Sequence, residues 1–283
     1  MATRYINPYT DFGFKKLFGE EANKDLLTDF LNQLLPVRHQ IKELTFLNTE
    51  NLNDTVAERK AIFDLNCISA SGEHFIVEMQ KAKIKYFKDR ALFYTTFPIK
   101  KQSEKGDWDF RLSPIYYIAI LDFFYDEEEE KAKVKRDVQL KDQDCEVFFD
   151  KLQYTFLQMP AFKKQAHELA TRYDKWLYFL KHLEDFNDIP AILREPIFEK
   201  AFNIAEISNF NPMQMEAYQK SLLSYRDLVN VMNTKYEEGL EDGIEQVFEV
   251  IRCLSEGKSY EETAEITGLT LEQVSKIDKK RKK

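Results

Sequence analysis

One segment of the chain is apolar on both of its faces: residues 115–124 read Ile-Tyr-Tyr-Ile-Ala-Ile-Leu-Asp-Phe-Phe. Side chains alternate between the two faces of a strand, so a run without polar alternation predicts a strand at the centre of a sheet that helices cover on both sides. The run is about half the length that a membrane-spanning helix needs. It therefore predicts an α/β domain and argues against a membrane protein.

The remaining segments supply the other elements of that domain. Thr10 or Asp11 is expected to cap a short helix that Gly19 ends, and a second helix is expected to start at Asn23. The changes between strand and helix periodicity divide the chain into a domain over 1–160, a helical region over 161–256 and a small tail over 257–283. The pattern predicts strands at 41–47, 56–68, 74–80, 114–124, 134–140 and 152–159, and helices at 86–101, 161–185, 192–208 and 212–256.

Composition excludes several classes of protein. The chain is 43% apolar and 14% aromatic with only 8 Gly and 8 Pro, which argues against extensive disorder. Its 3 cysteines form no CxxC pair, so neither a disulfide framework nor a thiolate zinc site is expected. No signal-peptide pattern is present at the N-terminus, and we expect a cytoplasmic protein without an organic cofactor. The net charge of -8 argues against nonspecific nucleic-acid affinity over the whole surface.

Acidic residues interrupt the apolar run of two neighbouring predicted strands. Alternation places Ile62, Asp64, Asn66 and Ile68 on one face, and Ile76, Glu78 and Gln80 on one face of the next strand. If residues 70–72 form a three-residue hairpin loop with Gly72 in the left-handed conformation, paired positions sum to about 142. That register sets Asp64 opposite Glu78.

Two opposed carboxylates repel each other unless a cation lies between them. Oxygen ligands with an adjacent amide and no nearby cysteine favour Mg²⁺ or Mn²⁺ over zinc, and such ions assist phosphodiester hydrolysis. The hairpin therefore predicts a metal site built on Asp64 and Glu78, with Gln80 placed to orient a water or a phosphate oxygen. The alternative is that both carboxylates lie on an edge strand and face solvent.

Five motifs in sequence order resemble one known family. They are Thr10-Asp-Phe-Gly-Phe-Lys-Lys-Leu-Phe18, Phe63-Asp-Leu65, Val77-Glu-Met-Gln80, Asp89-Arg-Ala-Leu-Phe-Tyr94 and Ile118-Ala-Ile-Leu-Asp-Phe123. The set is similar to the recombination-promoting nuclease (Rpn) family of bacterial transposases, within the PD-(D/E)XK nuclease superfamily. The resemblance covers roughly residues 5 to 250.

The resemblance implies a restriction-endonuclease-like core, a mixed sheet flanked by helices, followed here by a helical C-terminal region. It also implies magnesium-dependent DNA endonuclease activity linked to recombination, mobile elements or phage defence. Asp64, Glu78 and Gln80 match the motif positions, and Gln80 stands where many of these nucleases carry a lysine. Asp11 matches an acidic position of the first helix as a third metal ligand, or it is a helix cap. Glu58 departs from the basic lead that the family places before the central aspartate.

A nuclease without that lysine needs another cation near its site. Lys60 shares the strand parity of Asp64, and Arg90 with Tyr94 lies on one face of the helix after the hairpin. Residues 81–105 hold eight basic and two acidic side chains, with Lys81 and Lys83 closest to the hairpin. This stretch is expected to follow DNA phosphates, or it is a solvated helix face.

The tail after Gly257 has the pattern of a helix, a glycine turn and a second helix. Ala264, Ile266, Leu269 and Val274 are expected to pack the two helices together. If the second helix enters a major groove, Gln273 and Lys276 face DNA; otherwise the hairpin is a packing or dimerisation unit.

Two functions fit these patterns. The first is a metal-dependent DNA endonuclease that acts as a homodimer. The second is a catalytically weak DNA-binding or regulatory protein that keeps the nuclease fold, because Gln80 removes the usual lysine.

Overall fold

A computed structural model describes residues 3–36, 40–51, 61–103, 109–125 and 132–281. The chain forms two compact units, Met1–Leu222 and Leu223–Lys283, and the long helix α6 (Pro212–Ser255) contributes to both. The sequence-based boundaries at 160 and 256 remain predictions. No helix in the described part of the chain is long and apolar enough to span a membrane.

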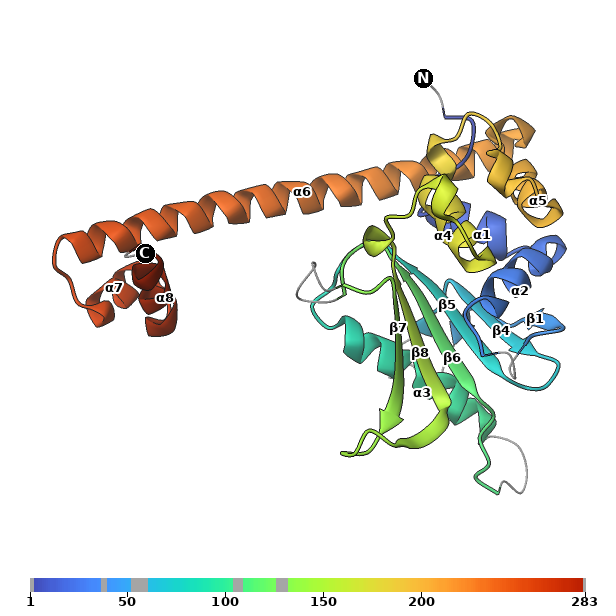
Figure 1. Cartoon of the computed structure of the whole chain (residues 1–283), viewed down its shortest axis with the longest axis horizontal. Helices are drawn as coiled ribbons and strands as arrows, with labels where there is room; N and C mark the ends of the chain where they lie inside the picture. Colours follow the sequence, from blue (N-terminus) through green and yellow to red (C-terminus); the bar gives the residue numbers. More distant parts are fainter. Residues whose placement is uncertain (1–2, 37–39, 52–60, 104–108, 126–131, 282–283) are drawn as a thin grey trace. The chain divides into compact units, whose positions relative to one another are not determined.

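The N-terminal unit is built on a mixed sheet of strand order β1-β4-β5-β6-β8-β7 (Figure 1). β5, β6 and β8 are parallel to one another, whereas β1 and β4 at one edge and β7 at the other pair antiparallel to their neighbours. The strands are β1 (Leu44–Phe46), β4 (Leu65–Ser69), β5 (His74–Gln80), β6 (Ile115–Leu121), β7 (Lys135–Lys141) and β8 (Val147–Gln158), and β2 (Glu50–Asn51) pairs separately with β3 (Ala61–Ile62).

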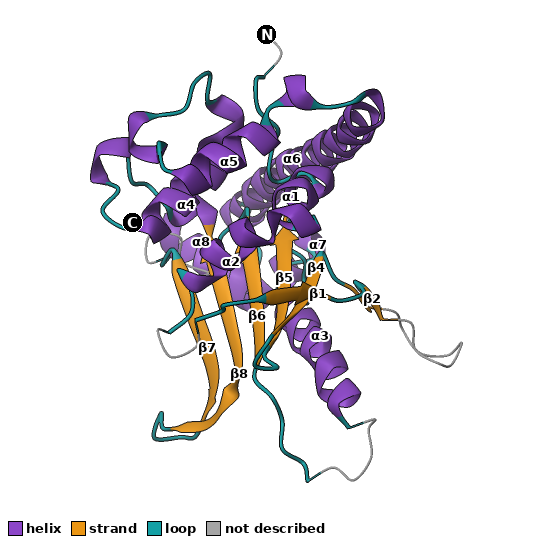
Figure 2. Cartoon of the chain, turned by 90° about the vertical axis from the view of Figure 1, so that its right-hand side faces the viewer, coloured by secondary structure: helices purple, strands orange, loops and turns teal. Residues whose placement is uncertain are grey.

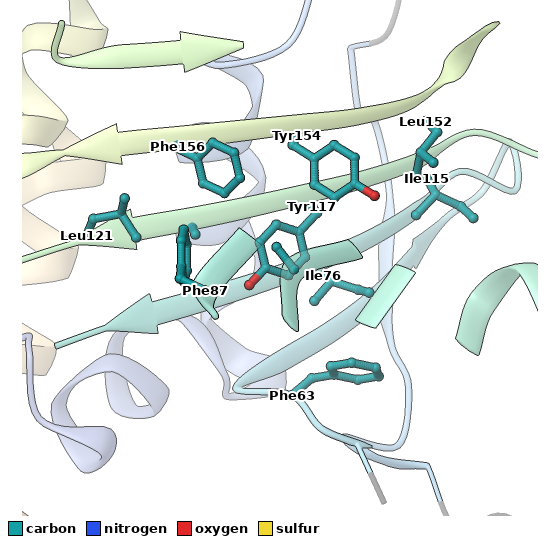
Figure 3. Packing of buried hydrophobic residues seen from close by; sticks show 11 residues of the cluster. Phe63, Ile76, Phe87, Ile115, Tyr117, Leu121, Leu152, Tyr154 and Phe156 are labelled. Atoms are coloured by element: carbon teal, nitrogen blue, oxygen red, sulfur yellow. The ribbon is translucent and has the colours of Figure 1, made fainter. Parts of the chain in front are cut away.

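The predicted central strand is confirmed. β6 lies between β5 and β8, and all seven of its residues are buried. On one face, α3 (Phe87–Gln102) packs Phe87 and Ala91 onto Ile76, Tyr117 and other residues of a buried cluster (Figure 3). This is the mixed sheet flanked by helices that the sequence predicts.

A second group of helices lies at the end of the sheet where β5 terminates (Figure 2). Their core is aromatic: the Trp176 ring centroid lies 4.8 Å from that of Phe198 and 5.8 Å from those of Phe18 and Phe30. The α-helices of this group are α1 (Asp11–Phe18), α2 (Lys24–Asn32), α4 (Arg172–His182) and α5 (Pro196–Ala205), and the 3-10 turns are η1 (Glu21–Asn23), η4 (Met159–Ala161), η5 (Ala166–Glu168), η6 (Leu183–Asp185), η7 (Ala191–Leu193) and η8 (Ile207–Asn209).

Two predicted boundaries are wrong for identifiable reasons. The helix expected over 161–185 is restricted to α4, because the Thr171 side chain accepts the Asp174 N–H and fixes the helix start there. The strand expected over 56–68 is interrupted, since β3 ends at Ile62 and β4 begins at Leu65. Residues 56–60 of that run, including Glu58 and Lys60, lie outside the described residues.

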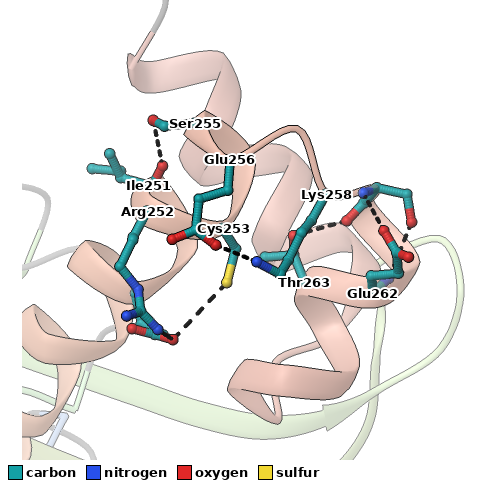
Figure 4. A network of polar contacts seen from close by, with 10 residues as sticks. Ile251, Arg252, Cys253, Ser255, Glu256, Lys258, Glu262 and Thr263 are labelled. Atoms are coloured by element: carbon teal, nitrogen blue, oxygen red, sulfur yellow. Dashed lines mark hydrogen bonds and ion pairs between the residues drawn. The ribbon is translucent and has the colours of Figure 1, made fainter.

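The C-terminal unit joins the end of α6 to α7 (Tyr260–Thr267) and α8 (Leu271–Arg281) around buried Val250, Cys253, Thr263 and Val274. Ser259 and Glu262 form a capping box at the start of α7, and Figure 4 shows this polar network. Gly268 ends α7 at φ +70°, so the helix, turn and helix of the prediction are present. Ile266 does not join the core as expected; its side chain is 51% exposed.

Candidate active site

The hairpin between β4 and β5 has the predicted register. Leu65 pairs with Val77 and Cys67 with Phe75, so paired numbers sum to 142. Gly72 adopts φ +90° in the three-residue loop, the left-handed conformation that favours glycine. Asp64 therefore stands immediately before β4, across from Glu78 near the end of β5.

The two carboxylates are fixed by each other's backbone. The Asp64 N–H donates to Oε1 of Glu78 at 3.2 Å, and the Met79 N–H donates to Oδ2 of Asp64 at 2.7 Å. These bonds occupy positions where ladder hydrogen bonds would continue the strand, which explains why β4 begins only at Leu65. The Glu78 side chain is 2% exposed, and Asp64 is half-buried. The second oxygen of Asp64, Oδ1, has no hydrogen-bond partner among the described residues.

Burial and mutual repulsion shift the pKa values of both acids upward. Burial first, and then the charge of Asp64, raise the pKa of Glu78 to about 8, although Arg90 opposes the shift. Burial also raises the pKa of Asp64, with a smaller contribution from the charge of Asp11. One proton on this pair is therefore stable near neutral pH when no cation is bound.

α3 and β6 supply the groups around Glu78. Arg90 Nη2 lies 3.2 Å from Oε2 of Glu78, and its guanidinium carbon lies 5.0 Å from the centroid of the Tyr94 ring. The predicted pairing of Arg90 with Tyr94 on one helical face is thus present. Arg90 Nε and the buried hydroxyl of Tyr117 have no hydrogen-bond partner among the described residues. Both are polar atoms beside Glu78 with unused hydrogen-bonding capacity.

α1 brings a second set of charges toward Asp64. Thr10, not Asp11, caps the helix, because its Oγ1 accepts the Gly13 N–H at 3.0 Å. Asp11 instead forms an ion pair with Lys15 at 2.9 Å, four residues on. The charges of Asp11 and Lys15 both act on the pKa of Asp64, so α1 and the hairpin share one electrostatic environment.

Three further predicted residues, Gln80, Lys81 and Lys83, follow Glu78 along the chain. Gln80 is the half-buried last residue of β5, and it shares the face of Glu78. Lys81 follows it; burial lowers the Lys81 pKa, and the charges of Asp11 and Asp64 oppose that shift. Lys83 is exposed and lines a separate cavity of about 230 Å³ together with Lys85 and Lys88.

In the C-terminal unit, one predicted DNA-facing residue, Gln273, already forms hydrogen bonds at the start of its helix, whereas the other, Lys276, is exposed. Oε1 of Gln273 accepts the N–H of Thr270 at 2.8 Å and lies 3.0 Å from its hydroxyl oxygen, so the amide caps α8. Adenine readout by glutamine uses both the oxygen and the nitrogen of the amide, and that contact would require the cap to open. Lys276 is exposed on the next turn.

The donor set fits a hard divalent cation but offers two converging carboxylates rather than three. Among the described residues, no group of three His, Cys, Asp or Glu side chains is placed to hold a metal, and Asp11 as a third ligand stays a prediction. Mg²⁺ retains several waters and is commonly bound through one or two carboxylates. The unpartnered Oδ1 of Asp64 and the raised pKa of Glu78 both suit a cation in place of the shared proton.

Two residues of this environment were not identified from the sequence. Lys15 follows Asp11 by one helical turn, so i,i+4 spacing was an available signal. Tyr117 lies in an apolar strand, and its place beside Glu78 depends on the parallel register that pairs Glu78 with Ala119. No local sequence signal sets that register.

Comparison with known proteins gives one match. A family model described as PD-(D/E)XK nuclease family transposase matches residues 8–235. The matched range contains α1, the β4–β5 hairpin and α3. No curated protein and no solved structure matches the chain.

Proposed function

Because the chain belongs to the PD-(D/E)XK nuclease family of transposases, we propose that it is a metal-dependent endonuclease that hydrolyses phosphodiester bonds of DNA. The observation that carries the proposal is the pairing of Asp64 with Glu78. Each carboxylate is anchored by a backbone N–H of the opposite strand, although the arrangement raises both pKa values. If the pair had only a structural role, replacing either acid by a neutral residue would make the protein more stable. Keeping both acids at this cost therefore points to a function.

Asp64 and Glu78 are the residues that would hold Mg²⁺ or Mn²⁺. A bound ion of this kind polarises a phosphate oxygen and lowers the pKa of a bound water. The two backbone N–H donors hold the carboxylates in place before the ion arrives, which reduces the reorganisation that binding requires. We keep Asp11 as an outer charge that acts on Asp64 through space.

Two basic side chains, Arg90 and Lys81, supply the positive charge that a lysine at position 80 would bring. Arg90 pairs with Glu78 at 3.2 Å and keeps one positive charge beside the carboxylate pair. Lys81 brings a second positive charge close to Asp64. Gln80 is proposed to orient a water or a phosphate oxygen through its amide, as its position on the face of Glu78 allows.

DNA is the proposed partner, and the basic stretch after the hairpin is its proposed path. Lys83, Lys85 and Lys88 surround one cavity. Tyr86 is 64% exposed beside Lys85, whose Nζ lies 5.5 Å from the ring centroid. Lysines with an exposed aromatic ring are suited to phosphates and to a stacked base. Lys276, with Gln273 if its cap opens, would add contacts from the C-terminal unit.

Three broader predictions accompany this proposal. The family membership favours a role in mobile elements, and recombination or phage defence are the programmes that the Rpn resemblance suggests. A cytoplasmic location also remains a prediction. Homodimerisation would allow cleavage of both strands, and the exposed apolar side chains of α6, such as Tyr236 at 73% and Leu240 at 52%, provide a surface for it.

A second function is favoured by one specific contact. Arg90 is already paired with Glu78, and Gln80 carries no charge, so the site has less positive charge available for a phosphate than a lysine at position 80 would supply. A catalytically weak DNA-binding or regulatory protein that keeps the fold is the alternative. Binding of DNA without turnover at any divalent metal concentration would distinguish it.

The test is conversion of supercoiled plasmid to nicked and linear forms with Mg²⁺, with Mn²⁺ and with EDTA. Asp64→Asn is the informative variant, because the amide oxygen can still accept the Met79 N–H while the charge is removed. Asp227→Asn, an exposed acid on α6, is the matched control. We expect metal-dependent cleavage in wild type and control and its loss in Asp64→Asn. Equal cleavage by all three proteins would refute the assignment.

A further inference from the structure

A cavity of about 380 Å³ opens next to Asp64. One wall is α1, and the other is the end of β1 with the residues that follow it. Asp64 and Leu65 close the cavity where β4 begins. The lining residues are Phe12, Lys15, Lys16, Gly19, Glu20, Phe46, Leu47, Thr49, Asp64 and Leu65.

The walls of this cavity are held by contacts outside it. The Phe12 ring packs against those of Phe210 and Tyr218, at centroid distances of 5.6 and 6.0 Å. At Gly19, an added Cβ would lie 3.0 Å from Cδ2 of Leu65 and 2.9 Å from the carbonyl oxygen of Lys15. Helix and strand therefore approach closely at Gly19 and Leu65, two of the residues that line the cavity.

The cavity lining combines apolar side chains with polar and charged ones. Phe46 and Leu47 give an apolar surface, Thr49 adds a hydroxyl, and two lysines project from α1. Lys16 is 14% exposed and pairs with Glu20 at 2.9 Å, whereas Lys15 is 45% exposed and pairs with Asp11 at 2.9 Å. Two acids, Glu20 and Asp64, also line the cavity, so the more exposed Lys15 is the cation that a phosphate can reach, while the apolar side chains suit a flat ring.

We propose that this cavity receives one unpaired nucleotide adjacent to the scissile phosphodiester, with its base against Phe46 and its phosphate near Lys15. The inference rests on the proposed nuclease function and adds the substrate class. Asp64 is shared by the cavity and the carboxylate pair, so a nucleotide here is one step along the strand from the reacting phosphate.

The proposal requires one base to leave the duplex, because a ring that packs against Phe46 cannot also stay stacked between its neighbours. The volume of the cavity is at the small end of ligand pockets, which suits a single base and sugar. A nucleotide can enter only after it leaves the duplex stack, and unstacking costs least where the base is mismatched or already single-stranded. The protein is therefore expected to prefer DNA that has an unpaired nucleotide, such as a mismatch, a bulge or a frayed end, over a fully paired duplex.

The experiment measures binding without turnover, in EDTA. Two hairpin oligonucleotides carry the same 2-aminopurine, either paired with thymine or opposite an abasic position, and fluorescence reports both affinity and the stacking of that base. Wild type is expected to bind the unpaired form about tenfold more tightly than the paired form, the size of one base stacked on an aromatic side chain. Phe46→Ala should remove the preference.

Two further variants make the test decisive. Thr49→Trp fills the cavity without removing a packed side chain, so it should abolish the preference even if Phe46→Ala fails to fold. Phe148→Ala removes an aromatic ring that is 80% exposed on β8 and should retain it. Equal affinity of wild type for the two hairpins, or a preference that survives Thr49→Trp, would overturn the proposal. Plasmid cleavage by that same wild type would show that only the subsite has failed and the nuclease function stands.

Discussion

Two buried carboxylates of the N-terminal unit have opposite electrostatic environments. Asp174, at the start of α4, and Glu78, on β5, are 4% and 2% exposed. Asp174 accepts the backbone N–H groups of Ala170 and Thr171 and pairs with Lys164 at 2.8 Å. These contacts outweigh the effect of burial and lower the Asp174 pKa, whereas burial and the charge of Asp64 raise that of Glu78.

Burial alone therefore does not mark a functional acid in this protein. The neighbouring groups set the pKa: Asp174 accepts hydrogen bonds from backbone N–H groups and from Lys164, and its carboxylate completes a capping box with Thr171. Glu78 faces another acid, and its one ion pair does not compensate for the repulsion. An acid that is costly in its charged form suits a site that a cation completes.

The largest effect that separates the two acids should be on catalysis. Glu78→Gln removes a ligand charge and is expected to lower metal-dependent cleavage about a thousandfold, since metal-assisted charge stabilisation contributes several kcal/mol. Asp174→Asn should leave the specific activity of the folded protein within about twofold, because a cap away from the reacting groups enters only through stability. Plasmid cleavage rates measured below the unfolding transition check both values. Comparable losses of cleavage in the two variants would show that the two acids do not differ in function.

The contributions of Glu78 and Asp174 to the free energy of unfolding should change in opposite directions with pH. The folded pKa of Glu78 lies at about 8, above its ordinary value of 4.5, so the folded state holds a proton that the unfolded state has lost between these two values. The free energy of unfolding of the metal-free protein should therefore fall as pH rises through this window, by up to about 1.4 kcal/mol per pH unit. Asp174, with its lowered pKa, should act oppositely and lose its contribution as pH falls below its ordinary value of 3.8.

Urea denaturation in EDTA across this range measures the slope. Glu78→Gln is expected to flatten it, since the amide does not titrate. Mg²⁺ should reduce the slope in wild type, because binding favours the deprotonated pair. A slope that is unchanged in Glu78→Gln would show that another group titrates in this window.

A moderate effect is expected on stability at fixed pH. Asp174→Asn keeps the size of the side chain but weakens its bonds to two backbone N–H groups and to Lys164, so it should destabilise the protein by about 1 to 2 kcal/mol. Glu78→Gln at pH 9 in EDTA should be neutral or stabilising, because it removes a repulsive charge. Chemical denaturation at that pH compares the two variants, and a loss of stability in both would contradict the distinction.

Local signals predicted the hairpin, and distant pairing determined the rest of the site. Gly72 and the alternation of side chains were sufficient to set Asp64 across from Glu78, because a short loop fixes antiparallel register. The neighbours of Glu78 on β6 follow from a parallel pairing across a long connection through α3, which no turn specifies. The break at Asp64 was also missed, since its cause is a hydrogen bond from the backbone of Met79 on the other strand.

The fold was predicted in the same uneven way. Apolar periodicity located β6, α3 and α6 within a few residues, because these elements bury continuous stripes or both faces. The boundary of α4 was predicted too early, since Thr171 and Asp174 specify the start through a capping box that periodicity does not detect. Caps that interrupt an apolar pattern are therefore the local signal to examine first.

The smallest expected difference concerns two tyrosines, one beside each acid. The hydroxyls of Tyr117 and Tyr173 are buried without a hydrogen-bond partner among the described residues, and burial raises both pKa values. Removing an unsatisfied hydroxyl should be neutral or should stabilise each protein by up to about 1 kcal/mol, so Tyr117→Phe and Tyr173→Phe should unfold alike. Of the two tyrosines, only Tyr117 adjoins Glu78 and Arg90, so its buried hydroxyl can stabilise the Glu78 carboxylate once that group is charged. Tyr117→Phe should therefore lower plasmid cleavage by about the strength of one hydrogen bond, roughly two- to tenfold, while Tyr173→Phe leaves it unchanged. An equal response would place Tyr117 in the core alone and limit the site to its charged residues.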